Sequence, residues 1–206
     1  MKVLIIDYGM GNLGSIFRAL EEVGANPVIS DNPDLIEEFK HIILPGVGSF
    51  SAGVKNLKEK GLYKKLKEIS NNKNSKLLGI CLGMQLLADC GYEGDFQEGL
   101  GLIKGKVEKL KSTKNEKIPH VGWNEVHHKK KDFLLNGIAS GTDFYFVHSF
   151  QFIPENKENI IAKTPYCNDF VSIIKKDNVM GVQFHPEKSQ IFGLKLLKNF
   201  IECESC

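Results

Sequence analysis

The first two-fifths of the chain alternates short apolar runs with segments whose apolar residues recur at helical spacing. Residues 3–6 (VLII) form one such run, and residues 13–23 place Leu, Ile, Phe, Leu and Val along one helical face. The first pattern is typical of a buried strand and the second of an amphipathic helix. The alternation continues with predicted strands at residues 27–29, 42–44 and 77–80, and predicted helices at residues 33–39, 53–69 and 84–89.

These predicted strands are apolar on both faces, which is typical of a mainly parallel sheet covered by helices on two sides. From about residue 101 the pattern changes to strand-like pieces separated by turn residues, which favour antiparallel extensions of the sheet. The sequence therefore predicts an α/β, three-layer, doubly wound fold. The later strands are predicted at residues 102–110, 120–127, 144–152, 160–163, 170–175 and 179–184, followed by a helix at residues 190–202.

No linker, low-complexity stretch or internal repeat divides the 206 residues, so we expect residues 1–206 to form a single domain. The composition, 42% hydrophobic and 25% charged, is typical of a globular chain that buries a core. No apolar run approaches the ~18 to 20 residues of a membrane span. The N-terminal apolar run is also too short for a signal peptide. We therefore expect a cytoplasmic protein with no membrane partner.

The formal net charge of +2 gives no overall electrostatic reason to expect nucleic-acid binding. Lysines cluster at residues 104–117 and 129–131, which we interpret as solvated surface, with a partner-facing or anion-binding patch as the alternative. The five cysteines are an odd number without an export signal, which favours reduced thiols. The Cys-x-x-Cys at residues 203–206 has no second pair to complete a zinc site, so we expect no metal.

The sequence LLGICLGMQ (residues 77–85) places a cysteine between two glycines, where a predicted strand meets a helix. In an open α/β sheet, ligands bind beyond the carboxyl ends of the strands, where Cys81 falls. The Gly-x-Cys-x-Gly spacing is the thiol counterpart of a nucleophile elbow. The following helix would stabilise a thiolate, and the Leu82 backbone N–H would face a developing oxyanion. From this motif alone, a small buried structural cysteine is an equal alternative.

A nucleophilic thiol needs a base, and GVQFHPEKS (residues 181–189) supplies a candidate. His185 directly follows an apolar strand, and Glu187 could orient its ring through one imidazole nitrogen. The intervening proline disfavours a helix at His185 and keeps the segment extended. We expect structural roles for the histidines without such a neighbouring carboxylate, which are His41, His120, His127 and His128.

A second oxyanion donor is expected from the loop after another strand. LPGVGSF (residues 44–50) is the candidate, because Pro45 and two glycines make a rigid turn whose amides need not be covered by side chains. A plain connecting turn is the alternative interpretation.

Taken together and in this order, PGVGSF, GICLGMQ and QFHPEKS resemble the class I (triad) glutamine amidotransferases. Four further segments are similar to the same family: IDYGMGNLGSI, EGLGLIKGKV, IPHVGWNEV and YFVHSF. The resemblance runs from the first predicted strand to the last helix. It implies the flavodoxin-like, mainly parallel sheet of that family.

The resemblance also implies a reaction and a set of site residues. Cys81 would attack the side-chain amide of L-glutamine, His185 would pass a proton to the leaving ammonia, and Glu187 would orient His185. Water would then hydrolyse the γ-glutamyl thioester to glutamate. The implied oxyanion hole uses the amides of Val47 and Leu82, in a loop shaped by Gly46 and Gly48. The implied glutamine-binding residues are Gln85, Glu93, Ser149 and Phe150.

Ammonia itself gives a reason to expect a partner. In neutral water it is almost entirely ammonium, which is not a nucleophile, so it has to be passed on along a shielded path. The chain has no second catalytic region and no phosphate-binding Gly-x-x-x-x-Gly-Lys. The resemblance implies a heterodimer with a (β/α)8-barrel cyclase, which makes imidazole glycerol phosphate and AICAR in histidine biosynthesis. The residues implied at that interface are Tyr8, Met10, Asn12, Trp123, Tyr145, Lys188 and Ser189.

Three alternative functions follow from the same residues. A paralogue could use identical glutaminase chemistry to supply ammonia for amidation of a surface nucleotide sugar, which GLGLIKGKV, LLADCG and Phe150 favour. A catalytically inactive regulatory subunit would lack the triad, whose residues are all present. A stress-type cysteine hydrolase or redox sensor would need functional oxidation of Cys81, and PGVGSF and HPE argue against it. None of these functions requires a cofactor, and we expect none.

Overall fold

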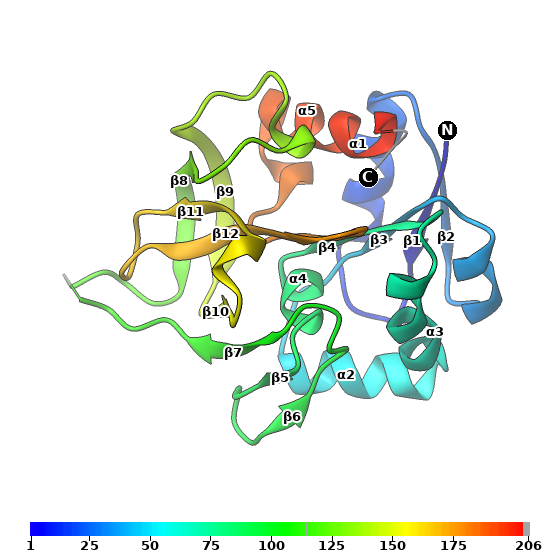
Figure 1. The fold of residues 1–206 in the computed structure, drawn as a ribbon, viewed down its shortest axis with the longest axis horizontal. Coiled ribbons are helices and arrows are strands. Elements are labelled where there is room, and N and C mark those ends of the chain that lie inside the picture. Colours follow the sequence, from blue (N-terminus) through cyan, green and yellow to red (C-terminus); the bar gives the residue numbers. More distant parts are fainter. Residues whose placement is uncertain (114, 204–206) are drawn as a thin grey trace.

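A nine-stranded sheet forms the centre of the protein in the computed structural model, which describes residues 1–113 and 115–203 (Figure 1). Five strands are mutually parallel, and crossover connections join the first four of them in the chain, so that each starts from the same edge. In spatial order these are β2 (Asn26–Ser30), β1 (Lys2–Ile6), β3 (His41–Leu44), β4 (Lys76–Ile80) and β13 (Val179–Val182). Four antiparallel strands extend the sheet: β12 (Phe170–Lys176), β11 (Ile160–Thr164), β8 (His120–His128) and β9 (Thr142–His148).

Helices cover both faces of this sheet, as the apolar strands predict (Figure 1). Along β1, alternate side chains point to opposite faces, so Val3 and Ile5 join one buried cluster while Leu4 and Ile6 join the other. The first cluster is covered by α1 (Leu13–Glu22) and α5 (Gln190–Glu202). The second cluster is covered by α2 (Phe50–Glu59), α3 (Leu62–Glu68) and α4 (Leu82–Leu86). The predicted three-layer α/β fold is therefore confirmed.

A second sheet of four strands was not expected from the sequence pattern. It consists of β10 (Phe150–Pro154), β7 (Gly105–Lys109), β5 (Cys90–Gly91) and β6 (Gln97–Glu98). The prediction of one strand over residues 144–152 is wrong, because the chain leaves the main sheet after His148 and enters the second sheet at Phe150. The carbonyl of Ser149, between the two strands, accepts a hydrogen bond from Leu110 N at 2.8 Å. This change of sheet sets the position of residues 149 and 150.

Two predicted helices differ from the observed ones. Residues 33–39 contain a 3₁₀-helix, Pro33–Glu37, instead of an α-helix. Helix α4 begins directly after Cys81 and ends at Leu86, three residues before the predicted end. It stops because the backbone N–H groups of residues 100–103 take the carbonyls of Leu86, Leu87 and Ala88. The remaining 3₁₀-helices are Ile69–Asn71, Phe133–Leu135, Lys157–Asn159 and Pro186–Lys188.

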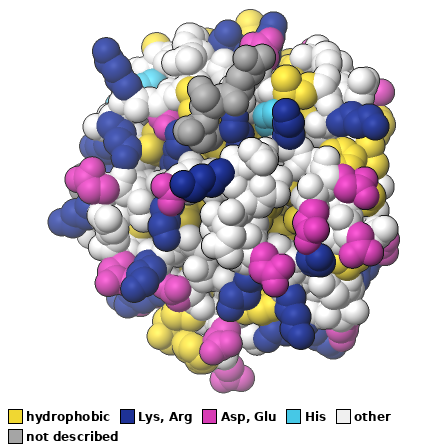
Figure 2. Space-filling view, turned by 45° about the vertical axis from the view of Figure 1, so that its right-hand side comes forward, with side chains coloured by type: hydrophobic (Ala, Val, Ile, Leu, Met, Phe, Trp, Pro, Cys, Tyr) yellow, Lys and Arg dark blue, Asp and Glu magenta, His cyan; other side chains and the backbone are white. Residues whose placement is uncertain are grey.

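Figure 2 shows Lys and Arg side chains interspersed with Asp and Glu over the face it displays. Within residues 1–113 and 115–203, no helix is long and apolar enough to cross a membrane, and no group of three His, Cys, Asp or Glu side chains could hold a metal ion. The described cysteines are free thiols; Cys206, the other half of the Cys-x-x-Cys, lies outside the described residues.

Candidate active site

Cys81 occupies a strained turn between β4 and α4. Its backbone φ is 53° and its ψ is −108°, a conformation that residues other than glycine rarely adopt. A Cβ atom on Gly83 would lie 1.8 Å from the Leu44 carbonyl oxygen, and one on Gly79 would lie 2.6 Å from the Gly83 oxygen. Both glycines are therefore required for α4 to start so close to β3 and β4. This is the local geometry of a nucleophile elbow.

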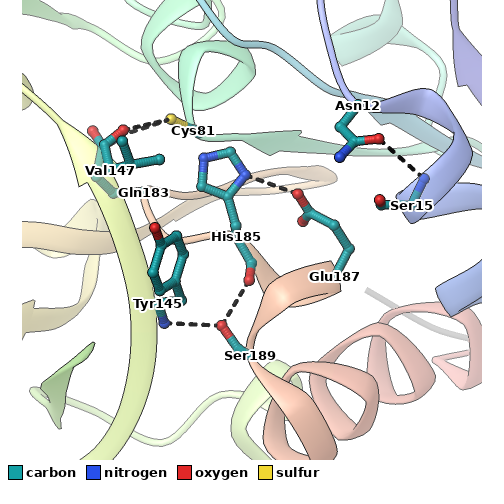
Figure 3. A network of polar contacts seen from close by, with 9 residues as sticks. All are labelled: Asn12, Ser15, Cys81, Tyr145, Val147, Gln183, His185, Glu187 and Ser189. Carbon is teal, nitrogen blue, oxygen red and sulfur yellow. Dashed lines mark hydrogen bonds and ion pairs between the residues drawn. The ribbon is translucent and has the colours of Figure 1, made fainter. Parts of the chain in front are cut away.

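The thiol of Cys81 faces groups contributed by two other strands (Figure 3). Its Sγ atom lies 3.8 Å from the carbonyl oxygen of Val147 on β9 and 3.7 Å from the side-chain Nε2 of Gln183, just after β13. Cys81 is only 6% exposed and Gln183 is wholly buried. The thiol is thus held between one acceptor and one donor at the carboxyl end of the central strands.

His185 and Glu187 form a buried pair beside Cys81. The ring Nδ1 lies 2.8 Å from Glu187 Oε1, and the two side chains are 2% and 1% exposed. The short helix Pro186–Lys188 turns the carboxylate back toward the ring. In Figure 3 the imidazole lies between Cys81 and Glu187, and Ser189 Oγ donates to the His185 carbonyl at 2.6 Å. Nε2, the other ring nitrogen, has no hydrogen-bond partner among residues 1–113 and 115–203.

The electrostatic surroundings of His185 favour its protonated form. Burial by itself would lower the pKa of the ring, but the adjacent Cys81 and Glu187 outweigh it and raise the pKa to about 10. At neutral pH the ring can therefore hold a proton next to a negatively charged neighbour. A histidine in this state can stabilise a thiolate and later release its proton to a leaving group.

A pocket of about 500 Å³ opens in front of the Cys81 thiol. The residues predicted for glutamine binding and for the oxyanion loop come from four segments far apart in the sequence, and most of them meet here. The lining residues are Val47, Gly48, Ser49, Cys81, Leu82, Gln85, Glu93, Val147, His148, Ser149 and Phe150. Of the predicted residues outside this lining, His185 lies beside Cys81 with Glu187 on the far side of its ring, and Gly46 belongs to the loop after β3.

The loop after β3 is packed tightly behind the pocket. A Cβ on Gly46 would lie 2.4 Å from the Tyr8 hydroxyl and 2.7 Å from the Leu82 Cβ, so only glycine fits. Gly48 has a φ of +112°, which also favours glycine. The Tyr8 hydroxyl donates a hydrogen bond to the Pro45 carbonyl at 2.7 Å, which ties the loop to the segment that follows β1. Glycines therefore allow this loop to approach the elbow.

Two pocket side chains are held by backbone groups. Glu93 Oε2 accepts a hydrogen bond of 2.7 Å from the Phe50 N–H, in the first turn of α2. Gln85 Nε2 donates to the Phe150 carbonyl at 3.0 Å and to Gln183 Oε1 at 3.1 Å. Glu93 is thereby tied to α2, and Gln85 to the segment at Phe150, on the walls of one cavity.

A chain of buried hydrogen bonds supports the pocket from behind. His148 Nδ1 lies 2.8 Å from the Phe150 carbonyl, which can only accept, so Nδ1 carries the proton and Nε2 accepts. His120 Nδ1 then donates to His148 Nε2 at 3.1 Å, and Asn124 Nδ2 donates to His120 Nε2 at 3.3 Å. Burial lowers the pKa of His120 to about 4 and that of His148 to about 3. Both rings are neutral at pH 7, as this one-way chain requires.

The residues expected at a partner interface do not all reach the surface. Asn12, Lys188 and Trp123 are exposed, and Met10 and Tyr145 are half-buried. Tyr8 and Ser189 are buried, and their place at or near the interface stays a prediction. The Tyr8 hydroxyl supports the loop after β3, and Ser189 Oγ is occupied by the backbone of residues 145 and 185.

Sequence reasoning missed several residues of the site. Gln183, Val147 and His148 lie within the segments GVQFHPEKS and YFVHSF but had no predicted role, because their contacts with the site depend on the packing of distant strands. His127 was expected to lack a carboxylate neighbour, but its Nε2 lies 2.9 Å from Glu125 Oε2. The spacing of two residues between Glu125 and His127 was a usable signal. That pair is exposed on β8, unlike the buried pair beside Cys81.

A thiol at a strand-to-helix elbow, a histidine–carboxylate pair beside it and a pocket in front define an α/β cysteine-dependent enzyme. The chain matches the family model of "Glutamine amidotransferase class-I" over residues 4–203. It belongs to the class I glutamine amidotransferases, and it is an enzyme of that family.

Individual relatives are similar over nearly their whole length. "Imidazole glycerol phosphate synthase subunit HisH 2" of Methanococcus maripaludis is 48% identical over 97% of this chain and 98% of its own. "Imidazole glycerol phosphate synthase subunit HisH" of Aquifex aeolicus is 46% identical, over 97% and 96%. Among solved structures, "Structure of PurLQS from Thermotoga maritima" has a TM-score of 0.74 at 19% identity, covering 97% of each chain. The last likeness shows the shared fold.

Proposed function

We propose that this chain is the glutaminase subunit of an imidazole glycerol phosphate synthase in histidine biosynthesis. It hydrolyses L-glutamine to glutamate and delivers the ammonia to a (β/α)8-barrel cyclase. The observation that carries the proposal is the meeting of Cys81, His185 and Glu187 at one end of a pocket of about 500 Å³. Relatives named as this subunit, 48% identical over 97% of the chain, support the same acceptor. The family match over residues 4–203 supports a single functional domain at residues 1–206.

The proposed reaction uses the Cys81 thiolate as the nucleophile. Sulfur forms a bond to the side-chain carbon of glutamine, and the carbonyl electrons move onto oxygen. The N–H groups of Val47 and Leu82 would stabilise that oxyanion, since both residues line the pocket. His185 then gives its proton to the departing nitrogen. The C=O bond re-forms as the C–N bond breaks, ammonia departs, and a γ-glutamyl thioester remains on Cys81.

Water completes the cycle with the same residues. The neutral His185 takes a proton from water, the hydroxide attacks the thioester carbon, and the C–S bond breaks to release glutamate and the thiolate. Glu187 holds the ring in the required orientation through Nδ1, at 2.8 Å. We assign Gln85, Glu93, Ser149 and Phe150 to holding the glutamine molecule, because all four line the pocket.

The proposed partner surface is the outward face of β8 and β9. Val121, Trp123 and Val147 are 58%, 47% and 36% exposed, although large apolar side chains favour burial. Trp123 and Tyr145 face each other across the two strands, with ring centroids 6.0 Å apart, and Lys188 Nζ lies 5.7 Å from the Tyr145 ring. Because Val147 also lines the pocket, a protein that covers this face would lie next to the site of ammonia release.

The test is to copurify the chain with the barrel cyclase of the same genome's histidine pathway. Glutamine hydrolysis is then measured for the chain alone, for the complex, and for the complex with the cyclase's nucleotide substrate. We expect strong stimulation in the complex and no turnover in Cys81→Ala, with the complex still formed. Residual activity near wild type in Cys81→Ala would refute the proposed nucleophile.

The same experiment separates the proposed acceptor from a second one. A paralogue that supplies ammonia for amidation of a nucleotide sugar would use the same triad and the same pocket, which Phe150 lines. Suppose that glutamine hydrolysis depends on Cys81 but the chain does not bind the histidine-pathway cyclase. This result would refute the histidine-pathway acceptor and support the nucleotide-sugar branch.

A further inference from the structure

Gln183 is wholly buried at the end of β13, and its side chain is hydrogen-bonded at both ends. Its Oε1 accepts a hydrogen bond from Gln85 Nε2 at 3.1 Å, and its Nε2 lies 3.7 Å from Cys81 Sγ. Gln85 Nε2 also donates to the Phe150 carbonyl at 3.0 Å. A continuous chain of amide contacts therefore joins the wall of the glutamine pocket to the nucleophile, through a residue with no assigned role.

The chemistry of the partners fixes which end of Gln183 faces the thiol. The Phe150 carbonyl can only accept a hydrogen bond, so the amide end of Gln85 that contacts it must be the NH₂ group. That same NH₂ group contacts Gln183, which must present its oxygen to it. The NH₂ group of Gln183 is then directed at Cys81 Sγ, an orientation that the hydrogen-bond partners fix.

The two contacts of Cys81 Sγ suit different protonation states of the thiol. A thiol can donate its proton to the Val147 carbonyl, 3.8 Å away. A thiolate has no proton to donate there and needs a donor, and Gln183 Nε2 is a fixed donor that is always protonated. The Gln183 contact is therefore worth more to the thiolate than to the thiol.

We propose that Gln183 is a further catalytic residue, whose amide N–H stabilises the Cys81 thiolate and holds it facing the glutamine pocket. This inference rests on the proposed role of Cys81 as the nucleophile. It predicts that the reactivity of Cys81 depends on the donor at position 183 even when no glutamine is present. It also gives Gln85 a second task, since Gln85 fixes the orientation of the Gln183 amide.

The first experiment measures the rate of Cys81 alkylation by iodoacetamide from pH 5 to pH 10, followed by mass spectrometry of the Cys81 peptide. The thiolate attacks carbon, a C–S bond forms and iodide leaves, so the rate reports the reactive thiolate without requiring turnover. Gln183→Glu replaces the NH₂ donor by an oxygen of equal size, and Gln183→Met removes the donor without adding charge. The other titratable side chains that act on Cys81 or His185 are Tyr8, Glu187 and His148, and they are unchanged in both variants.

Asn199→Asp is the matched control. Asn199 is a buried amide whose Nδ2 donates to the Leu134 and Asn136 carbonyls, in α5 and away from the pocket. Exchanging its NH₂ group for oxygen disturbs the fold in the same chemical way without changing the surroundings of Cys81. Thermal unfolding of all variants separates loss of stability from loss of reactivity.

We expect both Gln183 variants to be alkylated about ten to a hundred times more slowly than wild type at pH 7.5, since a hydrogen bond to a charged group contributes that factor. The pH midpoint of alkylation should move upward and kcat should fall by a similar factor, with a smaller change in KM. Asn199→Asp should keep the wild-type profile. Wild-type alkylation and kcat in folded Gln183 variants would overturn the inference.

A measurement on the wild-type protein covers the case in which neither Gln183 variant folds. The assigned side-chain NH₂ resonances of Gln183 should titrate with the same midpoint as Cys81 alkylation, and a titration without that midpoint would overturn the inference. Failure of the proposed function looks different. In that case Cys81→Ala retains glutamine hydrolysis, whatever the alkylation profiles show.

Discussion

Replacing His148 by asparagine should make the protein less sensitive to acid. In the wild type, His148 is 6% exposed and donates through Nδ1 to the Phe150 carbonyl, and its Nε2 accepts from His120. Protonation of His148 would put a second N–H, on Nε2, against the N–H of His120, and the hydrogen bond between the two rings would be lost. Asparagine can place its Nδ2 near the position of Nδ1 and cannot be protonated. The variant therefore keeps the contact to the pocket and removes the titration.

The magnitude follows from the pKa of His148, which burial lowers from 6.5 to about 3. Below pH 6.5 the unfolded chain takes up a proton at this ring, while the folded chain does not until the pH approaches 3. The unfolded state then binds more protons, so stability falls as the pH falls. At pH 5, about 1.5 pH units below the pKa of the ring in the unfolded chain, the free energy of unfolding has therefore fallen by about 2 kcal/mol. His120, with a pKa of about 4, acts in the same direction.

His185 has the opposite sign and has to be separated from this effect. Its pKa is raised to about 10, so its contribution to stability is complete below pH 6.5 and is lost as the pH rises toward 10. Between pH 6.5 and pH 5 it contributes no slope. Comparing a variant with wild type at the same two pH values cancels His185 and the carboxylates.

The assay is urea unfolding at pH 7.5 and pH 5.0 for wild type, His148→Asn and the control His127→Gln. We expect the free energy of unfolding to fall by about 2 kcal/mol less in His148→Asn than in wild type over this interval. His127 is 42% exposed, so its variant should follow wild type. An equal drop in His148→Asn and wild type would refute the argument that this ring is buried in its neutral form.

Two further predictions concern the His185 pair and the elbow. Glu187→Gln removes the negative charge that helps raise the pKa of His185, and we expect kcat to fall roughly hundredfold with the fold retained; unchanged glutaminase kinetics would exclude Glu187 from the mechanism. Gly83→Ala places a Cβ 1.8 Å from the Leu44 carbonyl oxygen and should lower the free energy of unfolding in urea by roughly 3 kcal/mol. Gly14→Ala, with open space around its Cβ in α1, should not destabilise the protein. Equal stabilities of the two variants would contradict the packing argument.

Several features of this protein are determined by short stretches of its sequence. The strands β1, β3 and β4 and the helices α1 and α5 follow from apolar periodicity within about ten residues. The elbow at Cys81 needs only its flanking glycines, and the pairing of His185 with Glu187 needs only the proline between them. Such features are predictable because the residues that cause them are neighbours in the chain.

Only the tertiary structure decided which distant residues meet. The register of β13 against β4 pairs Val182 with Ile80, and this alone places Gln183 next to Cys81, 102 residues earlier. The change of sheet after His148 brings residues 149 and 150 to the pocket, although local periodicity indicated one continuous strand. The burial of Tyr8 depends likewise on packing against the loop after β3. Strand register and burial are set by the whole core at once, so no local pattern in the sequence encodes them.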